Sequence, residues 1–147
     1  MPKRRISGAK VSRLGLENDE QEDQVHHGGP DRAVCIFSLE KVHALQEEGH
    51  PIQIGSAGEN LTVQGIAWES VMPGVRLRVG GQVVLEVTSF TSPCKTIRRS
   101  FVDGKFVRIS QKVHPGWSRV YARVIAEGDI RIGDPIEIVR LSQINPL

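Results

Sequence analysis

A chain of 147 residues has the size of one ordinary domain, and we therefore predict a single domain over residues 1–147. Hydrophobic residues make up 39% and charged residues 24% of the chain, and no apolar run reaches the roughly 20 residues that span a bilayer. The basic N-terminus lacks the apolar stretch of a secretory signal, and two cysteines are too few for a disulfide framework. Together these features predict a cytoplasmic globular protein.

The net charge of +2 hides an uneven distribution. Residues 94–123 contain eight Lys or Arg against one acid, Asp103, so this segment carries +7 and the other residues sum to −5. A basic block in an otherwise acidic chain indicates an anionic partner, although the block alone does not separate a phosphate-bearing ligand from nucleic acid or solvent ions. The few aromatic residues are not interleaved with the basic ones, which argues against nucleic acid.

The first elements in the chain follow a polar, acidic start. The paired glycines and proline of "VHHGGPDRAV" predict a turn, and "AVCIF" after it predicts a strand. Ser38 is well placed to cap a helix over residues 39–48, which Gly49 ends. The apolar face of this helix comprises Leu39, Val42 and Leu45.

The rest of the chain favours strands. Residues 52–90 alternate with a period of two, and "VRLRV-GG-QVVLEVTSF" predicts a hairpin about a Gly-Gly turn, with Val83, Leu85 and Val87 on one face. The segments "TIRRSF" and "GKFVRISQKV" are predicted to be short helical pieces, with a strand as the alternative for the second. Two strand-like runs follow over residues 119–139. The expected fold class is mainly β, a barrel or sandwich with a few short helices.

The two cysteines have different surroundings. In "SFTSPCKTIRRSF", residues 89–101, Cys94 comes just past a strand and beside Lys95 and Arg98, whose positive charge favours a thiolate. A thiolate is both a nucleophile and a soft-metal ligand, and the alternative is an incidental loop cysteine beside solvated cations. Cys35 lies in the apolar run "RAVCIF" and is predicted to be a small buried hydrophobe that is not bonded to Cys94.

Histidines offer a second kind of site. None of the five has a paired spacing with Cys94, which argues against a structural zinc site. A Cys–His hydrolase stays open because the histidine need only be near in space, and His27 and His114 both lie in turns. The simpler alternative is that both are surface turn residues.

Further polar residues are candidates for binding an anion. Arg119 and Arg123 lie four residues apart, on one face of a strand, and would suit a bidentate phosphate clamp, unless this is only a solvated face. Arg32, after "GGPD", is either a surface charge or an oxyanion binder. Glu59 and Asn60 either cap their turn or direct hydrogen bonds into a pocket.

Five motifs occur in a fixed order along the chain: "HHGGPDRAV", "GSAGENLTV", "SPCKTI", "GWSRVYARV" and "GDIRIGDPIEI". In this order they resemble MOSC domains, the module found at the C-terminus of molybdenum cofactor sulfurases and as stand-alone bacterial proteins. The resemblance is strongest over residues 26–139, from about His26 to Val139, which is most of the chain.

The resemblance implies a MOSC-type β-barrel that binds the molybdenum cofactor, a pterin-bound molybdenum. In such domains the cysteine that matches Cys94 either ligates molybdenum or carries sulfur as a persulfide. Relatives with known activity reduce N-hydroxylated compounds with electrons from a separate flavin or iron–sulfur protein. The implied metal ligand and catalytic residue is Cys94, and the implied cofactor-binding residues are Arg32, Asn60, Lys95, Arg98, Arg119 and Arg123.

We therefore predict a small molybdenum-cofactor-dependent oxidoreductase, with a small-molecule substrate and a protein electron donor, and with neither nucleic acid nor membrane as a partner. The sequence departs from larger relatives because it has no aminotransferase-like half, no ferredoxin-type cysteine run and no large N-terminal β domain. These departures keep open an alternative in which the chain is a sulfur carrier, with a persulfide on Cys94, or a carrier of the cofactor without turnover.

Overall fold

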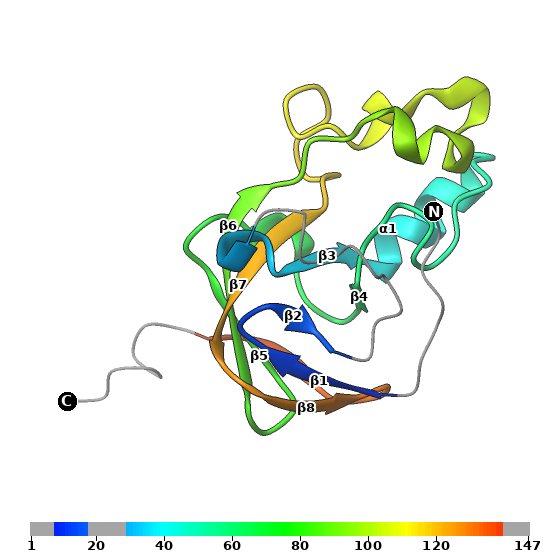
Figure 1. Ribbon diagram of the computed structural model, residues 1–147. Helices are drawn as coiled ribbons and strands as arrows, with labels where there is room; N and C mark the ends of the chain where they lie inside the picture. The colour runs from blue at the N-terminus through cyan, green and yellow to red at the C-terminus, as the bar shows by residue number, and fades with distance from the viewer. Residues whose placement is uncertain (1–7, 18–28, 140–147) are drawn as a thin grey trace.

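The computed structural model describes residues 8–17 and 29–139, and within these ranges the chain is mainly β, as predicted. The described residues form nine strands in two sheets, ordered β2-β1-β8 and β4-β3-β7-β6-β5-β9 (Figure 1). Paired strands are antiparallel except β3 and β4, which run parallel. The strands are β1 (Gly8–Ser12), β2 (Gly15–Leu16), β3 (Val34–Ser38), β4 (Leu61–Val63), β5 (Arg76–Val79), β6 (Val83–Phe90), β7 (Val120–Ala126), β8 (Gly128–Arg131) and β9 (Ile136–Val139).

The two sheets are joined by a nearly continuous segment, because only Glu127 separates β7 from β8. Before it, Ala126 pairs with Val84 of β6, and after it, Gly128 pairs with Val11 of β1. The sequence predicted two strand-like runs in residues 119–139, but the structure has three, because the chain changes partners at this residue. One segment that belongs to both sheets curls them into a half-barrel (Figure 1), the barrel-type fold that the sequence indicated.

The hairpin of β5 and β6 supplies much of the core. Its register pairs Val79 with Val83, so the loop holds residues 80–82, one residue more than the predicted Gly-Gly turn. Gly80 opens this loop with a φ of +64°, a conformation that suits glycine. Alternate β6 side chains are buried, as the period of two predicts, and these are Val83, Leu85 and Val87.

The predicted helix is α1 (Leu39–Glu47), which follows β3 directly. The Ser38 hydroxyl accepts a hydrogen bond from the Lys41 amide at 3.2 Å, which confirms the N-cap. Gly49, with a φ of +100°, ends the helix as expected. In the part of the chain that the structure describes, no helix is long and apolar enough to cross a membrane.

Between β6 and β7 the chain leaves the sheets and forms three short 3₁₀ helices, in agreement with the helical pieces predicted there (Figure 1). We call residues 95–117 the 3₁₀ lobe. Asp103 (φ 55°) and Gly104 (φ 68°) have left-handed backbone angles, which interrupt the helical turns. The helices are η4 (Lys95–Ser100), η5 (Val102–Gly104) and η6 (Phe106–Ile109). The buried apolar residues of the lobe are Ile97, Phe101 and Ile109.

Candidate functional site

Cys94 lies where the chain leaves the larger sheet, as the sequence predicted. Residues 91–93 separate it from the end of β6, and η4 begins at the next residue, Lys95. Its backbone is extended, with φ −144° and ψ 175°, and its thiol is free and exposed. A nucleophile or metal ligand needs this access, so the position suits reaction with a molecule from solution.

The surroundings of Cys94 favour its ionised form. Hydrogen bonding to Thr96, whose hydroxyl oxygen lies 2.9 Å from the Cys94 sulfur, lowers the pKa of the thiol, and the charges of Arg119 and Lys95 lower it further. The sequence predicted this direction from Lys95 and Arg98. The main cause is instead the neighbouring hydroxyl, and the contributing guanidinium is that of Arg119, from a segment 25 positions away (119 − 94).

Arg119 is a buried cation beside this exposed thiol. Only 5% of the residue is exposed, and its Nη1 donates to the Ala57 carbonyl at 2.6 Å. Its backbone carbonyl accepts from the Thr91 amide at 2.9 Å, which joins the start of β7 to the segment leading to Cys94. Its Nε is buried and has no hydrogen-bond partner among the described residues. A buried guanidinium with a donor to spare is suited to bind an anion.

The loop before β4 carries an acid that faces the same interior. Glu59 is 1% exposed, and burial raises the pKa of its carboxyl although the charge of Arg119 opposes the rise. One carboxylate oxygen accepts from the Gly55 amide at 3.0 Å and the Thr62 hydroxyl at 3.2 Å, while the other, Oε1, has no partner in the described part of the chain. Glu59 therefore braces its own turn, one of the two roles that the sequence left open.

Asn60 holds that loop against β3. Its side-chain oxygen accepts a hydrogen bond from the Cys35 backbone N–H at 2.8 Å, and its backbone N–H donates to the Cys35 carbonyl at 2.8 Å. The Cys35 sulfur lies 3.8 Å from the hydroxyl of buried Thr91. Cys35 is thus a buried strand residue, and it is not bonded to Cys94, as expected.

Tyr121, the second residue of β7, links the two thiols to two arginines. Burial raises the pKa of its phenol, and negative charge on Cys35 or Cys94 adds to the rise, while Arg119 and Arg32 oppose it. The Arg32 guanidinium lies 5.2 Å from the ring centroid, a cation–π arrangement. The neighbouring strands β3, β7 and β6 and the loop before β4 therefore bring thiols and cations together at one end of the strands.

The remaining predicted basic residues are Arg123, Lys95 and Arg98. Arg123 binds the Glu86 carboxylate at 2.8 Å and lies 3.6 Å from that of Asp31, whereas Arg119 turns inward. The structure therefore does not join Arg119 and Arg123 in a common contact, and a phosphate clamp made by both stays a prediction. Lys95 and Arg98 are exposed on the 3₁₀ lobe.

The histidine alternatives gain no support from contacts. His114 is exposed, and its backbone hydrogen bonds stay within the 3₁₀ lobe, while His27 lies outside the described residues. Within residues 8–17 and 29–139, no three His, Cys, Asp or Glu side chains form a group that could hold a metal ion.

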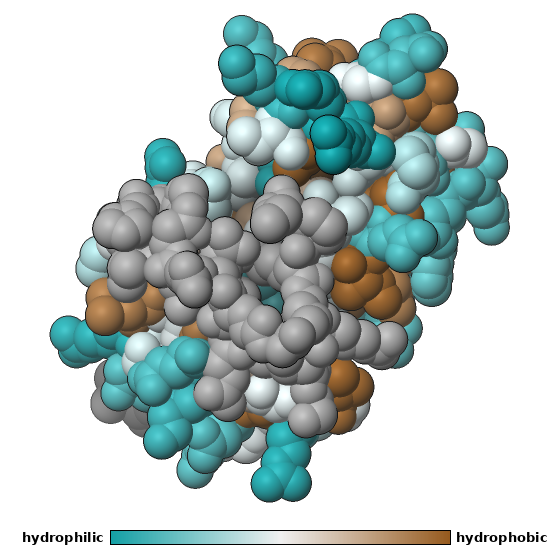
Figure 2. All heavy atoms as spheres, turned by 45° about the vertical axis from the view of Figure 1, so that its right-hand side comes forward, coloured by the Kyte–Doolittle hydropathy of each residue, from teal (hydrophilic) through white to brown (hydrophobic). Residues whose placement is uncertain are grey.

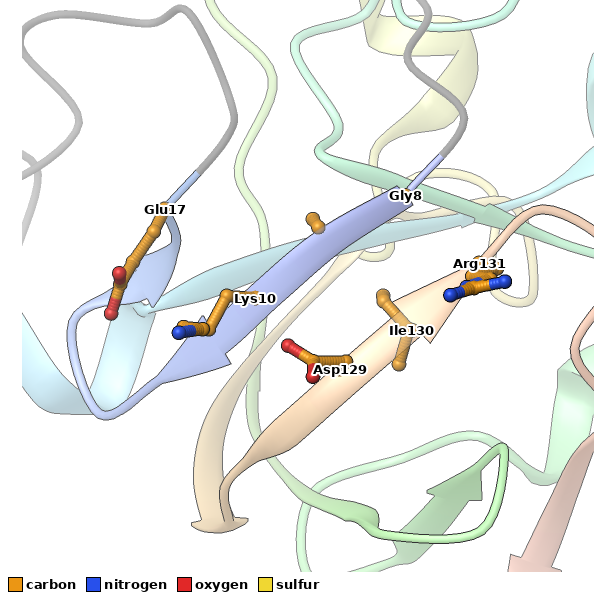
Figure 3. A pocket seen from close by; sticks show the side chains of 7 residues that line it. Gly8, Lys10, Glu17, Asp129, Ile130 and Arg131 are labelled. Atoms are coloured by element: carbon orange, nitrogen blue, oxygen red, sulfur yellow. The ribbon is translucent and has the colours of Figure 1, made fainter.

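One hollow of the described structure lies away from Cys94. It has a volume of about 700 Å³ and lies along β1 and β8, where Figure 3 shows Lys10, Glu17, Asp129 and Arg131 around it. Two acidic and two basic side chains give this hollow no single sign of charge. It lies beside the smaller sheet, whereas the thiol follows the far end of β6 (Figure 1).

Sequence reasoning missed two residues of the site, Thr96 and Tyr121. Thr96 was detectable in principle, because a hydroxyl two residues after a loop cysteine can reach its sulfur in a tight turn. Tyr121 lies between the two arginines of "SRVYAR", and its relation to both thiols depends on strand pairing that no local pattern contains.

The fold and site define a class of β half-barrel proteins with an exposed thiol just past the end of a central strand, near a buried arginine. The model of the MOSC domain family matches residues 23–137, and the chain belongs to this family, which is associated with the molybdenum cofactor.

Known relatives agree with this membership. The chain is 33% identical to the uncharacterized protein YflK of Bacillus subtilis over 90% of its own length, and 31% identical to the protein YiiM of Escherichia coli over 88%. It spans 59% and 58% of these relatives' lengths. A more distant relative, 29% identical over 87% of the chain and 23% of its own length, is named a reductase in Gibberella moniliformis. The crystal structure of a hypothetical protein superposes with a TM-score of 0.75 at 28% identity, over 96% of this chain and 65% of the other.

Proposed function

We propose that this protein binds the molybdenum cofactor through Cys94 and reduces N-hydroxylated compounds. The observation that carries the proposal is the pairing of an exposed thiol, whose pKa is lowered, with buried Arg119, whose Nε has no partner among the described residues. The name of the Gibberella moniliformis relative supports a reductase, and the family supports the cofactor.

The side chains present suit the proposed cofactor. A pterin dithiolene brings two sulfurs of its own, so that one further soft ligand from the protein suffices, and a thiolate is such a ligand. The cofactor also carries a phosphate, for which Arg119 offers a buried donor and Lys95 and Arg98 offer exposed ones. Arg32, beside Tyr121, would add a further cation at the same end of the strands, and Asn60 fixes the loop before β4 against β3.

The proposed reaction breaks the N–O bond of the substrate. Two electrons and two protons convert an N-hydroxyl compound to the corresponding N–H compound and one water, with the electrons from a separate reduced flavin or iron–sulfur protein. The bound cofactor would supply the centre that passes the electron pair to the substrate. The protein's own contribution is to keep Cys94 ionised through Thr96 and Arg119 and to hold negative groups beside it.

The proposal is tested by metal content. The wild-type chain, made in a host that synthesises the cofactor, is expected to co-purify with molybdenum and a pterin, and Cys94→Ser is expected to lose both. Cys35→Ser is the matched control, because it removes the buried thiol and leaves the exposed one. Reduction of an aromatic amidoxime by reduced methyl viologen should follow the molybdenum content. Equal molybdenum in wild type and Cys94→Ser would refute ligation by this thiol.

A second candidate function is sulfur carriage, and the exposed, readily ionised Cys94 favours it as well. The thiolate would attack the outer sulfur of a persulfide on a partner protein, so that Cys94 becomes the persulfide and the partner regains its thiol. A metal-free chain carrying about 32 Da of reducible sulfur on Cys94 would support this function. Both candidates place the protein in the cytoplasm, where an exposed thiol stays reduced.

A further inference from the structure

We propose that the 3₁₀ lobe, with its unpaired basic side chains and exposed valines next to Cys94, is the docking surface for an acidic electron-donor protein. This inference rests on the proposed reductase function, and it adds where the donor binds and which surface chemistry it has.

The lobe has a strong positive charge with few internal partners. It contains six Lys or Arg and one acid, Asp103. Arg108 is taken up by Glu48, to which it donates at 2.9 and 2.7 Å. The others form no ion pair with any described residue and are exposed: Lys95, Arg98, Arg99, Lys105 and Lys112. Such a surface attracts an acidic partner and steers its approach.

Apolar side chains lie among these charges. Val102 is 43%, Val107 46% and Val113 54% exposed. In Figure 2 the upper part of the molecule, where the lobe lies in Figure 1, shows hydrophilic groups with hydrophobic ones among them. A cationic surface with apolar contacts is typical of an interface that holds a protein by both electrostatic attraction and burial.

The same features favour a protein over a nucleic acid. Nucleic-acid surfaces stack bases on exposed aromatic rings, but Phe101 is buried and the Trp117 ring is covered by two cations. The Lys41 ammonium lies 4.2 Å and the Arg108 guanidinium 4.0 Å from the centroid of this ring. Phe106 is partly buried and packs against the core. The aromatic rings of the described lobe therefore serve internal packing, and its exposed apolar side chains are aliphatic.

The lobe is attached firmly enough to serve as a preformed surface. The Ser100 hydroxyl lies 2.7 Å from that of Ser56, and the Val102 amide donates to the His50 ring at 3.1 Å. The His50 ring also packs edge-on against Phe101, with centroids 5.4 Å apart. These contacts fix the backbone that carries the basic side chains before any partner binds, and this reduces the entropic cost of docking.

The position of the lobe suits electron delivery. Cys94 is the N-cap residue directly before η4, so a protein seated on this helix would lie beside the thiol. Lys95 follows Cys94 directly in the chain, so the docking surface and the candidate site are contiguous.

The test measures binding to purified acidic [2Fe–2S] ferredoxin and to acidic flavodoxin by titration calorimetry at low and high salt. Charge reversal of the lobe (Arg99→Glu, Lys105→Glu and Lys112→Glu together) is expected to weaken binding at least about tenfold at low salt. The matched control makes the same change in net charge on the smaller sheet, in β1, the turn after it and β8 (Lys10→Glu, Arg13→Glu and Arg131→Glu), and should alter binding less than about threefold. Val102→Ser with Val107→Ser should weaken the binding that persists at high salt.

Several outcomes would overturn the inference: binding of neither probe at low salt, equal effects of the two charge reversals, or tighter binding of single-stranded DNA than of both proteins. Running the titration on the Cys94→Ser chain separates this inference from the proposed function. If binding depends on the lobe but the wild type does not reduce amidoximes, the docking surface is supported and the proposed reductase function is refuted. If reduced methyl viologen supports amidoxime reduction but binding does not depend on the lobe, the reductase function is supported and the docking surface is refuted.

Discussion

The two cysteines of this chain lie in regions that differ in every property that governs thiol chemistry. Cys35 is inside β3 (Val34–Ser38), where its backbone pairs with that of Tyr121 in β7 and its sulfur faces buried Thr91. Cys94 is in the loop after β6, exposed, with a hydroxyl beside its sulfur. The same side chain is thus a packing unit in one place and a candidate ligand in the other. What differs is the access to solvent and the polar groups that the fold brings to each sulfur.

The largest expected effect is on the strand region. Phe37 is fully buried in β3 and packs edge-on against Trp68, with ring centroids 6.2 Å apart. Phe37→Ala is therefore expected to lower the free energy of unfolding by about 3–5 kcal/mol, measured by chemical denaturation. Cys94→Ala, the loop control, should change it by no more than about 0.5 kcal/mol. A similar loss in both variants would break the distinction between a structural and a functional region.

The next effect concerns Arg119, which contributes both to the stability of the fold and to the ionisation of Cys94. Arg119→Leu removes the bond to the Ala57 carbonyl and the charge near Glu59, and should destabilise the fold by about 1.5–3 kcal/mol. It should also raise the pKa of Cys94, seen as an alkylation profile displaced to higher pH. Arg119→Lys should restore most of the profile, because it keeps the charge. An unchanged profile in the Leu variant would show that Arg119 acts only on stability.

A smaller effect tests the hydroxyl beside Cys94. Thr96→Val keeps the shape of the side chain but removes the hydrogen bond to the sulfur, and alkylation of Cys94 near neutral pH should slow by about two- to tenfold. Thr96→Ser should keep the rate. The reaction is followed by mass spectrometry under native conditions, in which buried Cys35 stays unlabelled. Labelling of both cysteines at similar rates would contradict the contrast between the two regions.

The smallest effect is on the attachment of the 3₁₀ lobe. Hydrogen bonds from Arg108 lower the pKa of Glu48 below its ordinary value of 4.5, so their stabilisation is present above that pH and is lost as the pH falls through the folded-state pKa. Glu48→Gln should lower the free energy of unfolding by about 0.2–1 kcal/mol at neutral pH, as expected for an exposed pair. The variant should also lack the part of the stability loss at acid pH that comes from protonation of Glu48. Urea denaturation at pH 3 and 7 measures the difference, and an equal gap between the two proteins at both values would contradict this assignment.

Local patterns predicted the elements well where a single periodicity or cap dominates. The helix start at Ser38, the alternating burial of β6 and the short helical turns after Cys94 all follow from residues close in sequence. The division of residues 119–139 into three strands did not, because Glu127 breaks the run only through the change of partner strand. The order of motifs gave the family, which the match over residues 23–137 bears out.

For the site, the amino-acid sequence by itself determined which thiol would be exposed, because proline and polar neighbours keep Cys94 out of a strand while apolar neighbours put Cys35 inside one. Only the tertiary structure decided which cation acts on that thiol. Arg119 reaches it because β6 and β7 pair, and Arg123, four residues later, is held instead by Glu86 and Asp31. Electrostatic influence falls with distance in space, and distance in space between remote segments is set by strand pairing rather than by local sequence.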